Sequence, residues 1–335
     1  MFKFVKVYRA KSKLICGLKN QRAGNFDESL KCFDEVLEIL PDCKYVFGFK
    51  GAVYEDLKEF NNALKCFDMS IMQFPDRIQS WNSKAFLLSK LGRYDEAIEC
   101  LDKGLEINKN DIDLLIVKSN VFSDKCEYDK VLEVANEILS INSNEERGIH
   151  QKGFAFQMLG DYKNALEWYS LFTELYPKNV VAWYGLAGVY DDLEKYEDAC
   201  LTMKKAIDLD KHDSYNYFIY AIYLEKNNDY ETALKMINKA LDIEDYVTFY
   251  YVKGVALENL GNKDEAIENY KICLEKYIEF LENEYNSTNN YMIGRLYERL
   301  NQLDKAVEYY ENVLKIDYNC EKAKKRIENL KNKIL

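Results

Sequence analysis

A small residue recurs through this chain at an almost constant spacing of 34 residues. The series runs Gly17, Gly51, Ala85, Ser119, Gly153, Ala187, Ala221, Gly254 and Gly294. Its first six steps are all 34 residues, the seventh is 33 and the last is 40. A second series follows 12 positions later: Ser29, Ala63, Ala97, Val131, Ala165, Ala199, Ala233, Ala266 and Ala306. A fixed period of this size indicates a repeat architecture, in which each unit must stack on its neighbours to bury its apolar face.

Each repeat has the sequence pattern of two helices joined by a short turn. Apolar residues fall three and four apart before the turn, as in Trp81, Ala85 and Leu88, and again after it, as in Ala97 and Leu101. Only 14 Gly and 3 Pro occur in 335 residues, and a sheet protein rich in turns needs more of these turn-forming residues. The sequence therefore predicts an all-α fold without a sheet.

The repeats predict a single solenoid domain that spans residues 1–335. The expected repeats are residues 10–43, 44–77, 78–111, 112–145, 146–179, 180–213, 214–246, 247–280 and 287–320, with a polar capping helix at 321–335. Ala323, Ile327, Leu330 and Ile334 are expected to form the inward stripe of that cap. An insertion at 281–286 contains no helix breaker in Glu282-Asn283-Glu284, so we expect it to lengthen the second helix of repeat eight. A functional arm is the alternative reading of the insertion.

The repeats resemble those of the tetratricopeptide repeat family, whose pattern also covers 34 residues. The residues that carry the resemblance in repeat six are Trp183, Leu186, Ala187, Tyr190, Ala199, Met203 and Ala206. In repeat two they are Phe47, Gly51, Tyr54, Ala63, Phe67 and Pro75. The resemblance implies a right-handed α-α superhelix of about nine helix pairs. It also implies that the first helices line a concave groove that holds peptides or partner proteins.

Repeat four lacks an aromatic residue near Leu115 and departs from the pattern at three further positions. Cys126 stands where several repeats have Gly, Val131 replaces Ala, and Ala135 replaces Phe, Leu or Tyr. Large and small residues are exchanged, so we expect the packed volume to be conserved while its shape changes.

The composition argues against several classes of function. The net charge of −11 argues against binding to nucleic acid phosphates. The longest uncharged apolar stretches have 11 residues, where a membrane span needs about 20. Nine scattered Cys and two His form no metal-binding pattern, and no phosphate loop or catalytic motif occurs. We therefore expect a cytoplasmic protein that is not an enzyme, binds no membrane, and holds no metal or cofactor.

The first helices of repeats five to eight carry a second face that is rich in aromatic and acidic residues. The candidate groove residues are His150, Phe154, Tyr184, Gly188, Asp191, Asp192, Tyr215, Phe218, Ile222, Glu225, Tyr251 and Glu258. Aromatic side chains dominate interface energetics, and acids favour a partner with Lys or Arg. The pattern predicts a protein or peptide partner that carries basic and hydrophobic residues. A tyrosine at this place also packs neighbouring repeats in the family, so a purely structural role is an equally weighted alternative.

Three functions fit these observations. The leading hypothesis is a non-enzymatic interaction scaffold that takes a peptide or protein segment into its concave groove. The alternatives are a structural array that self-associates into homo-oligomers, and a regulatory subunit of a separate enzyme.

Overall fold

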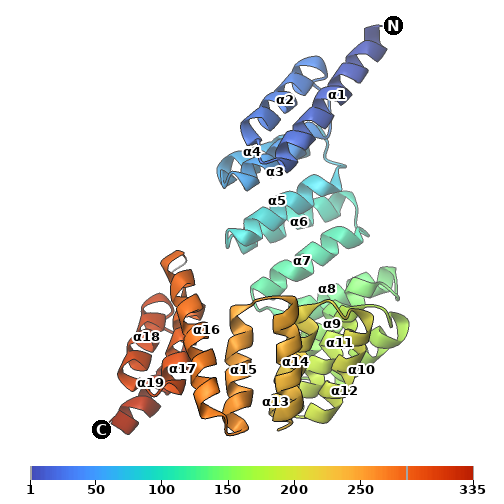
Figure 1. Cartoon of the computed structure of the whole chain (residues 1–335). Coiled ribbons are helices and arrows are strands. Elements are labelled where there is room, and N and C mark those ends of the chain that lie inside the picture. The colour runs from blue at the N-terminus through green and yellow to red at the C-terminus, as the bar shows by residue number, and fades with distance from the viewer. Residues whose placement is uncertain (1, 284–285, 335) are drawn as a thin grey trace. The chain divides into compact units, whose positions relative to one another are not determined.

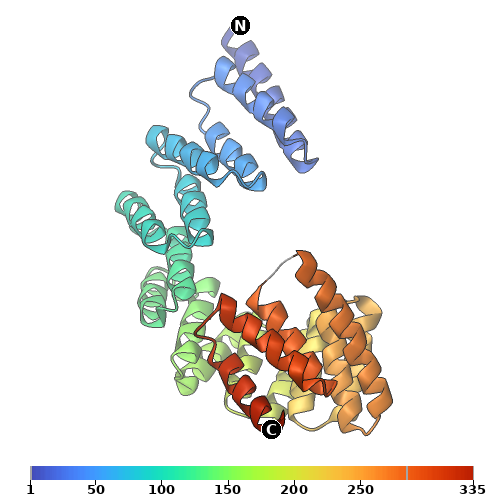
Figure 2. The same ribbon diagram turned by 90° about the vertical axis from the view of Figure 1, so that its left-hand side faces the viewer.

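The computed structural model describes residues 2–283 and 286–334, and every regular element within them is an α-helix. These helices fall into two compact units, Met1–Leu175 and Tyr176–Leu335. Within each unit successive helices pack side by side as pairs (Figures 1 and 2). The predicted all-α superhelical fold is confirmed. That the repeats form a single domain stays a prediction.

The first unit holds the helix pairs of repeats one to five. Its helices are α1 (Phe2–Arg22), α2 (Phe26–Ile39), α3 (Val46–Asp56), α4 (Phe60–Gln73), α5 (Ile78–Lys90), α6 (Tyr94–Ile107), α7 (Ile112–Asp124), α8 (Tyr128–Ile141), α9 (Glu146–Met158) and α10 (Tyr162–Leu175). The odd-numbered helices are the first helices of their repeats.

The second unit holds repeats six to nine and the C-terminal helix. Its helices are α11 (Val180–Asp192), α12 (Tyr196–Leu209), α13 (Ser214–Lys226), α14 (Tyr230–Ile243), α15 (Val247–Asn259), α16 (Lys263–Asn283), α17 (Ser287–Arg299), α18 (Leu303–Ile316) and α19 (Glu321–Ile334). Helix α16 has 21 residues where the other second helices have 14, so the insertion extends it as expected as far as Asn283. Residues 284 and 285 lie outside the described chain.

The C-terminal helix α19 packs on α18 through the stripe that the sequence predicts. Ala323, Ile327 and Leu330 are all buried. The side chain of Ile334, the fourth predicted member, lies outside the described residues. These three residues close the hydrophobic core of the second unit at its C-terminal end.

The turn inside each repeat always contains one residue with a left-handed backbone, two positions before the second helix. Four of these residues are glycines with φ between 71° and 86°. The other five are Lys58, Cys126, Glu194, Asn228 and Asn301, with φ between 56° and 60°. Cys126 is therefore one of five non-glycine residues in this conformation, and repeat four keeps the common turn.

The small residues of the first series face a large side chain 16 positions later on the partner helix. A methyl group added at Gly51 would lie 2.5 Å from the buried ring of Phe67, and one added at Gly254 would lie 2.4 Å from Tyr270. The same contact joins Gly17 to Phe33, Gly153 to Tyr169, and Gly294 to Tyr310. Each glycine of this series therefore allows an aromatic ring to lie directly against the helix backbone.

Where the first residue is larger, the second is smaller. The pairs are Ala85 with Leu101, Ala187 with Met203, Ala221 with Ile237, and, in repeat four, Ser119 with Ala135. Ala135 and Val131 of repeat four are fully buried. The conserved packed volume that the sequence predicts for repeat four stays a prediction.

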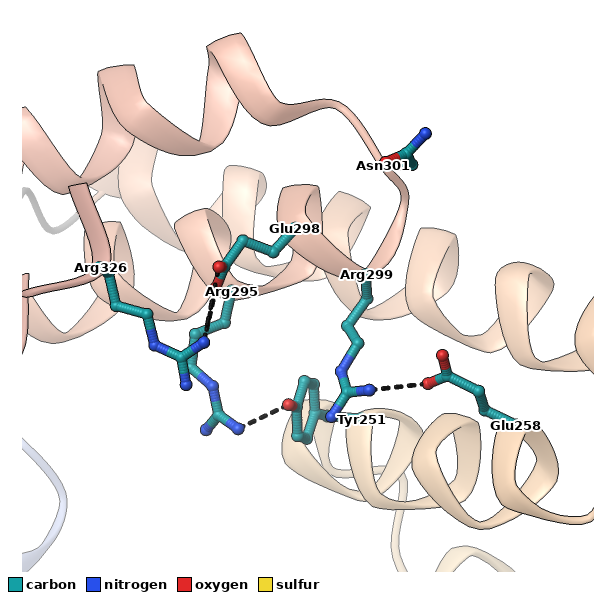
Figure 3. A pocket seen from close by; sticks show the side chains of 7 residues that line it. All are labelled: Tyr251, Glu258, Arg295, Glu298, Arg299, Asn301 and Arg326. Carbon is teal, nitrogen blue, oxygen red and sulfur yellow. Dashed lines mark hydrogen bonds and ion pairs between the residues drawn. The ribbon is translucent and has the colours of Figure 1, made fainter. Parts of the chain in front are cut away.

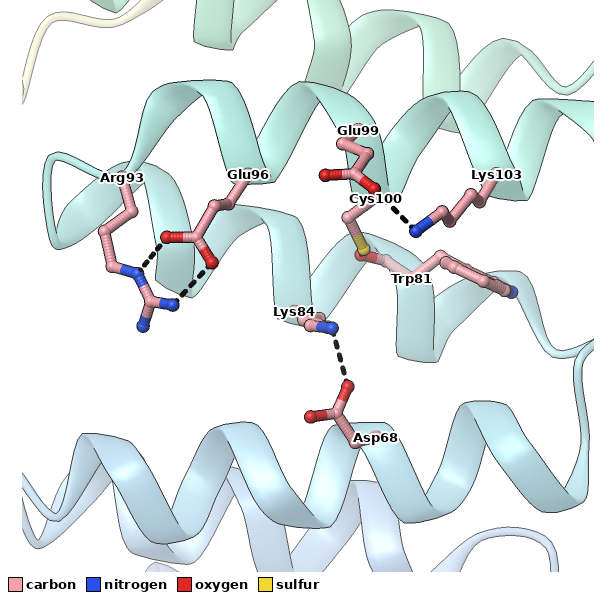
Figure 4. Close-up of polar contacts among 8 residues, drawn as sticks. All are labelled: Asp68, Trp81, Lys84, Arg93, Glu96, Glu99, Cys100 and Lys103. Atoms are coloured by element: carbon pink, nitrogen blue, oxygen red, sulfur yellow. Dashed lines mark hydrogen bonds and ion pairs between the residues drawn. The ribbon is translucent and has the colours of Figure 1, made fainter.

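An ion pair repeats across the first three junctions between repeats. Lys84 Nζ lies 2.6 Å from Asp68 Oδ1, which joins α5 to α4 (Figure 4). Asp34 with Lys50 and Asp102 with Lys118 form the same pair one period earlier and one later, at 2.5 and 2.6 Å. Each pair links the second helix of one repeat to the first helix of the next. Half-exposed pairs of this kind contribute about 0–1 kcal/mol each, so their effect on the free energy of unfolding is small.

We predict that Gly51→Ala destabilises the first unit by about 1–3 kcal/mol, because its methyl group must displace the buried ring of Phe67. The matched control is Gly48→Ala on the same helix. The atoms nearest to a methyl group there belong to the Arg77 guanidinium, at 3.1–3.4 Å, and alanine favours the helix by about 1 kcal/mol. Amide hydrogen exchange in α3 and α4 measures both changes, and equal effects would refute the role given to the Phe67 ring.

We predict that Lys58→Gly stabilises repeat two by roughly 0.5–1 kcal/mol, because glycine adopts the left-handed conformation without strain. Part of this gain is offset, because glycine has more conformational freedom in the unfolded chain. The reverse change in repeat three, Gly92→Lys, should destabilise by a similar amount. Thermal unfolding followed by circular dichroism gives the sign of each change. A loss of stability in Lys58→Gly would contradict the strain argument.

Candidate functional site

Five aromatic rings follow one another across the first helices of the second unit. Neighbouring centroids lie 5.8 Å apart for Tyr184 and Tyr215, 5.9 Å for Tyr215 and Phe218, 4.9 Å for Phe218 and Phe249, and 5.7 Å for Phe249 and Tyr246. The rings come from α11, α13 and the start of α15. We call these five residues the aromatic strip.

Two rings of the strip offer most of its surface. Tyr215 is 51% exposed and Tyr246 is 54% exposed, whereas Phe249 is only 3% exposed. Tyr184 and Phe218 are half-buried. The sequence reading identified Tyr215 but missed Tyr246, because Tyr246 stands just before α15 and outside the helical spacing that was followed.

Local hydrogen bonds fix the positions of Tyr184 and Tyr215. The Asp213 carboxylate caps α13 by accepting from the backbone N–H of Tyr215 at 2.9 Å. The Tyr184 hydroxyl donates to Oδ1 of the fully buried Asn216 at 2.6 Å. Burial raises the pKa of Tyr184, which keeps its hydroxyl protonated as a donor. Tyr184 thus also ties α11 to α13, the packing role that the sequence left as an alternative.

Two of the four acids predicted to attract a basic partner form ion pairs within the chain. Asp191 accepts from Lys226 at 2.5 and 2.7 Å, and Glu258 accepts from Arg299 at 2.9 Å. Burial raises the pKa of Glu225. The charges of Arg299 and Arg295 partly oppose that rise. Asp192 is exposed at the end of α11. Pairing reduces the negative charge that Asp191 and Glu258 present to a partner.

The remaining predicted residues of the second unit contribute unequally. Tyr251 is only 8% exposed, so it presents little surface to a partner. Ile222 is partly buried against the hydrophobic core of the second unit, and Gly188 is half-buried on α11.

His150 and Phe154 belong to the first unit, on α9. The His150 ring lies 6.0 Å from Tyr169, 6.1 Å from Phe172 and 6.4 Å from Phe154. Burial lowers the pKa of His150, as expected for an imidazole surrounded by rings. These contacts make His150 a packing residue of repeat five.

A cavity of about 430 Å³ opens on the C-terminal part of the second unit. It is lined by residues of α15, α17, the following turn and α19: Tyr251, Glu258, Arg295, Glu298, Arg299, Asn301 and Arg326 (Figure 3). We call it the arginine cavity. The sequence predictions do not include this cavity, because its arginines lie in repeat nine and the cap, beyond the predicted groove face of repeats five to eight.

A smaller hollow of about 350 Å³ lies in the first unit, between α5 and α7. Phe86, 60% exposed, lines it together with Ser89, Lys90, Val117, Asn120, Val121, Ser123 and Asp124. Its polar groups pair across the repeats, since Ser89 donates to Asp124 at 2.7 Å and Gln151 donates to Asn120 at 2.6 Å. The hollow contains one exposed ring, whereas the aromatic strip contains two.

Neither a metal centre nor a membrane span is found in the described part of the chain. No group of three or more His, Cys, Asp or Glu in residues 2–283 and 286–334 is placed to hold a metal ion. Over the same residues, no helix combines the length and the apolar character needed to cross a membrane.

Comparison with known proteins gives repeat-length matches. Residues 78–111, 180–213, 247–275 and 288–320 match models of the tetratricopeptide repeat. A tetratricopeptide repeat-containing protein of Methanocaldococcus jannaschii is 27% identical over 122 residues, which cover 36% of this chain and 20% of that protein. Subunit 3 of the anaphase-promoting complex of Schizosaccharomyces pombe is 25% identical over 145 residues, 43% of this chain and 21% of that protein. The matched region thus spans about a fifth of each relative.

Solved structures share the fold at low sequence identity. A tetratricopeptide repeat protein from Parabacteroides merdae has a TM-score of 0.58 at 13% identity, covering 75% of this chain and 99% of its own. The Cut9–Hcn1 hetero-tetramer of the anaphase-promoting complex gives 0.52 at 15% identity, covering 96% of this chain and 69% of the other. Because the matched repeats fall on helix pairs whose register the other repeats share, the chain contains repeats of the tetratricopeptide type.

Proposed function

We propose that this protein is a non-enzymatic interaction scaffold that binds a protein segment on the first helices of its second unit. The observation that carries the proposal is the aromatic strip, with Tyr215 and Tyr246 more than half exposed at its surface. Exposed aromatic rings held in place by buried neighbours are the type of side chain that anchors protein interfaces. The contact between α13 and α15 places these rings on adjoining helices.

Part of the strip is pre-organised for binding. The Tyr184 hydroxyl donates to Asn216, the Asp213 carboxylate accepts from the backbone N–H of Tyr215, and Phe249 backs the strip from the core. A surface whose side chains are already ordered loses less conformational entropy when a partner binds. An extended segment with one or two apolar side chains fits such a row of rings.

The sequence predicts a partner with basic and hydrophobic residues, and of these two features we propose only the hydrophobic residues. Lys226 and Arg299 already neutralise Asp191 and Glu258. The relatives agree with a role in assembly at the coarse level, since two of them are named as parts of the anaphase-promoting complex. For the compartment we propose the cytoplasm, where reducing conditions suit nine cysteines that are all free thiols.

The test uses the full-length chain as bait for a displayed library of random dodecapeptides. The dissociation constant of a selected peptide is then measured by fluorescence anisotropy for the unaltered chain and for Tyr215→Ala. We expect Tyr215→Ala to weaken binding by about 1–3 kcal/mol, roughly 5- to 150-fold, because an exposed anchor is lost.

The matched control is Phe86→Ala, which removes an equally exposed ring from the hollow of the first unit. It should change the dissociation constant less than twofold, and circular dichroism should show that both variants stay folded. Loss of binding in Phe86→Ala alone would place the site in the first unit. Sedimentation at several concentrations tests self-association, and a dimer that Tyr215→Ala dissociates would favour the structural array over the peptide scaffold.

A further inference from the structure

The guanidinium groups of three arginines point into the arginine cavity from two helices (Figure 3). Arg295 and Arg299 come from α17 and Arg326 comes from α19. Like charges repel one another, so a cluster of this kind needs counter-charges from the chain or from a ligand. What each arginine contacts decides whether any positive charge is left over.

Two of the three arginines are neutralised by the same arrangement of side chains. Glu258 accepts from the Tyr270 hydroxyl at 2.7 Å and from Arg299 at 2.9 Å. One repeat later, Glu298 accepts from the Tyr310 hydroxyl at 2.7 Å and from Arg326 at 3.1 Å. In both cases the tyrosine follows the glutamate by 12 residues, and the tyrosine ring packs against a glycine of the first small-residue series. These glutamates are thus occupied by structural partners.

The third arginine, Arg295, contacts a neutral group. Its Nη2 donates to the Tyr251 hydroxyl at 2.6 Å, and its Cζ lies 4.6 Å from the centre of that ring. A guanidinium has five N–H donors, so this contact leaves most of them available to the cavity. The nearby Glu225 acts on Arg295 only through space and without a hydrogen bond, and burial disfavours its charged form.

The surroundings of the cavity strengthen its positive character. Residues 287–334 contain ten Lys and Arg against seven Asp and Glu, in a chain whose net charge is −11. A second cavity of about 330 Å³ shares Arg326 and is lined by Tyr291, Lys322, Lys325 and Asn329. Basic side chains therefore continue from the arginine cavity along α19.

We propose that the arginine cavity binds the oxyanion of an acidic side chain, a carboxylate or a phosphate, carried by the protein segment that the scaffold holds. The peptide nature of this ligand rests on the proposed function. The anion site itself rests on Arg295. The planar fork of arginine matches carboxylate and phosphate oxygens in bidentate fashion, and the spare donors of Arg295 supply such a fork. A polynucleotide would need a track of several phosphate contacts on an otherwise acidic chain.

The test begins with small probes that need no knowledge of the partner. N-acetyl-glutamate amide and N-acetyl-phosphoserine amide are titrated into the ¹⁵N-labelled full-length chain at constant ionic strength, and the arginine Nε–Hε signals are followed by NMR. We expect a saturable shift of the Arg295 signal with both probes and none with N-acetyl-glutamine amide. The ratio of the two affinities distinguishes a carboxylate from a phosphate as the preferred group.

Variants separate a built site from general attraction to positive charge. Arg295→Gln should weaken the binding of both acidic probes at least tenfold, read from the Arg299 and Arg326 signals. Arg295→Lys keeps the charge and a donor to Tyr251 but loses the fork, and should weaken it at least threefold. Lys315→Gln removes the same charge from the exposed face of α18 and should have no effect. Circular dichroism checks the folding of each variant.

Several outcomes would overturn the proposal. Equal shifts with the glutamine probe, or equal losses in Lys315→Gln and Arg295→Gln, would show that Arg295 forms no specific site. Tighter binding of a ten-nucleotide adenylate RNA, lost in Arg295→Gln, would assign the cavity to nucleic acid. The Tyr215→Ala variant should bind the acidic probes normally, so that failure of the aromatic strip and failure of the anion site are read separately. Replacing an acidic residue in a peptide selected on the full chain should weaken its binding to the unaltered protein but not its binding to Arg295→Gln.

Discussion

The contact between a glycine on one helix and an aromatic ring on its partner is the constraint on which the rest of this structure depends. At Gly51 and Gly254 there is no room for even a methyl group beside the rings of Phe67 and Tyr270. Such a contact fixes how far apart the two helices lie and how they are rotated about their axes. The contact is present in five of the nine repeats, and the other four have Ala or Ser at the position of the glycine. Of the helices that carry the aromatic strip and the arginine cavity, α15 and α17 each hold such a glycine.

The same rings also link the core to the functional surface. Tyr270 and Tyr310 pack against Gly254 and Gly294 with their rings and hold Glu258 and Glu298 with their hydroxyls. Burial raises the pKa of both tyrosines, so the hydroxyls remain donors. Two carboxylates at the mouth of the cavity are therefore positioned by side chains whose other end is core. Arg295 donates to the neutral Tyr251 hydroxyl instead, so its positive charge is not neutralised as those of Arg299 and Arg326 are.

The sequence was sufficient for the fold because the fold is periodic. Nine copies of one pattern predict the helix pairs, and each second helix begins three residues before a member of the second small-residue series, as at Phe60 and Tyr94. The site was less predictable because its pairing is not confined to one period. Arg299 meets Glu258 across 41 residues and Arg295 meets Tyr251 across 44, after an insertion has shifted the register. The sequence pattern of a single helix face identifies an acid such as Glu258 but not the arginine of another repeat that pairs with it.

The ion pairs of the first unit bear on how such a chain changes length. Asp34, Asp68 and Asp102 each meet a lysine of the following repeat, so three successive junctions carry the same chemistry. Loss or duplication of one whole 34-residue segment by recombination within this stretch would rejoin an aspartate to a lysine and create no new kind of junction. The next junction differs, because Asn136 replaces the aspartate and Lys152 lies 4.1 Å from the centre of the Trp168 ring. An exchange of whole repeats among the first four therefore preserves this ion pair, whereas an exchange across the junction of repeats four and five does not.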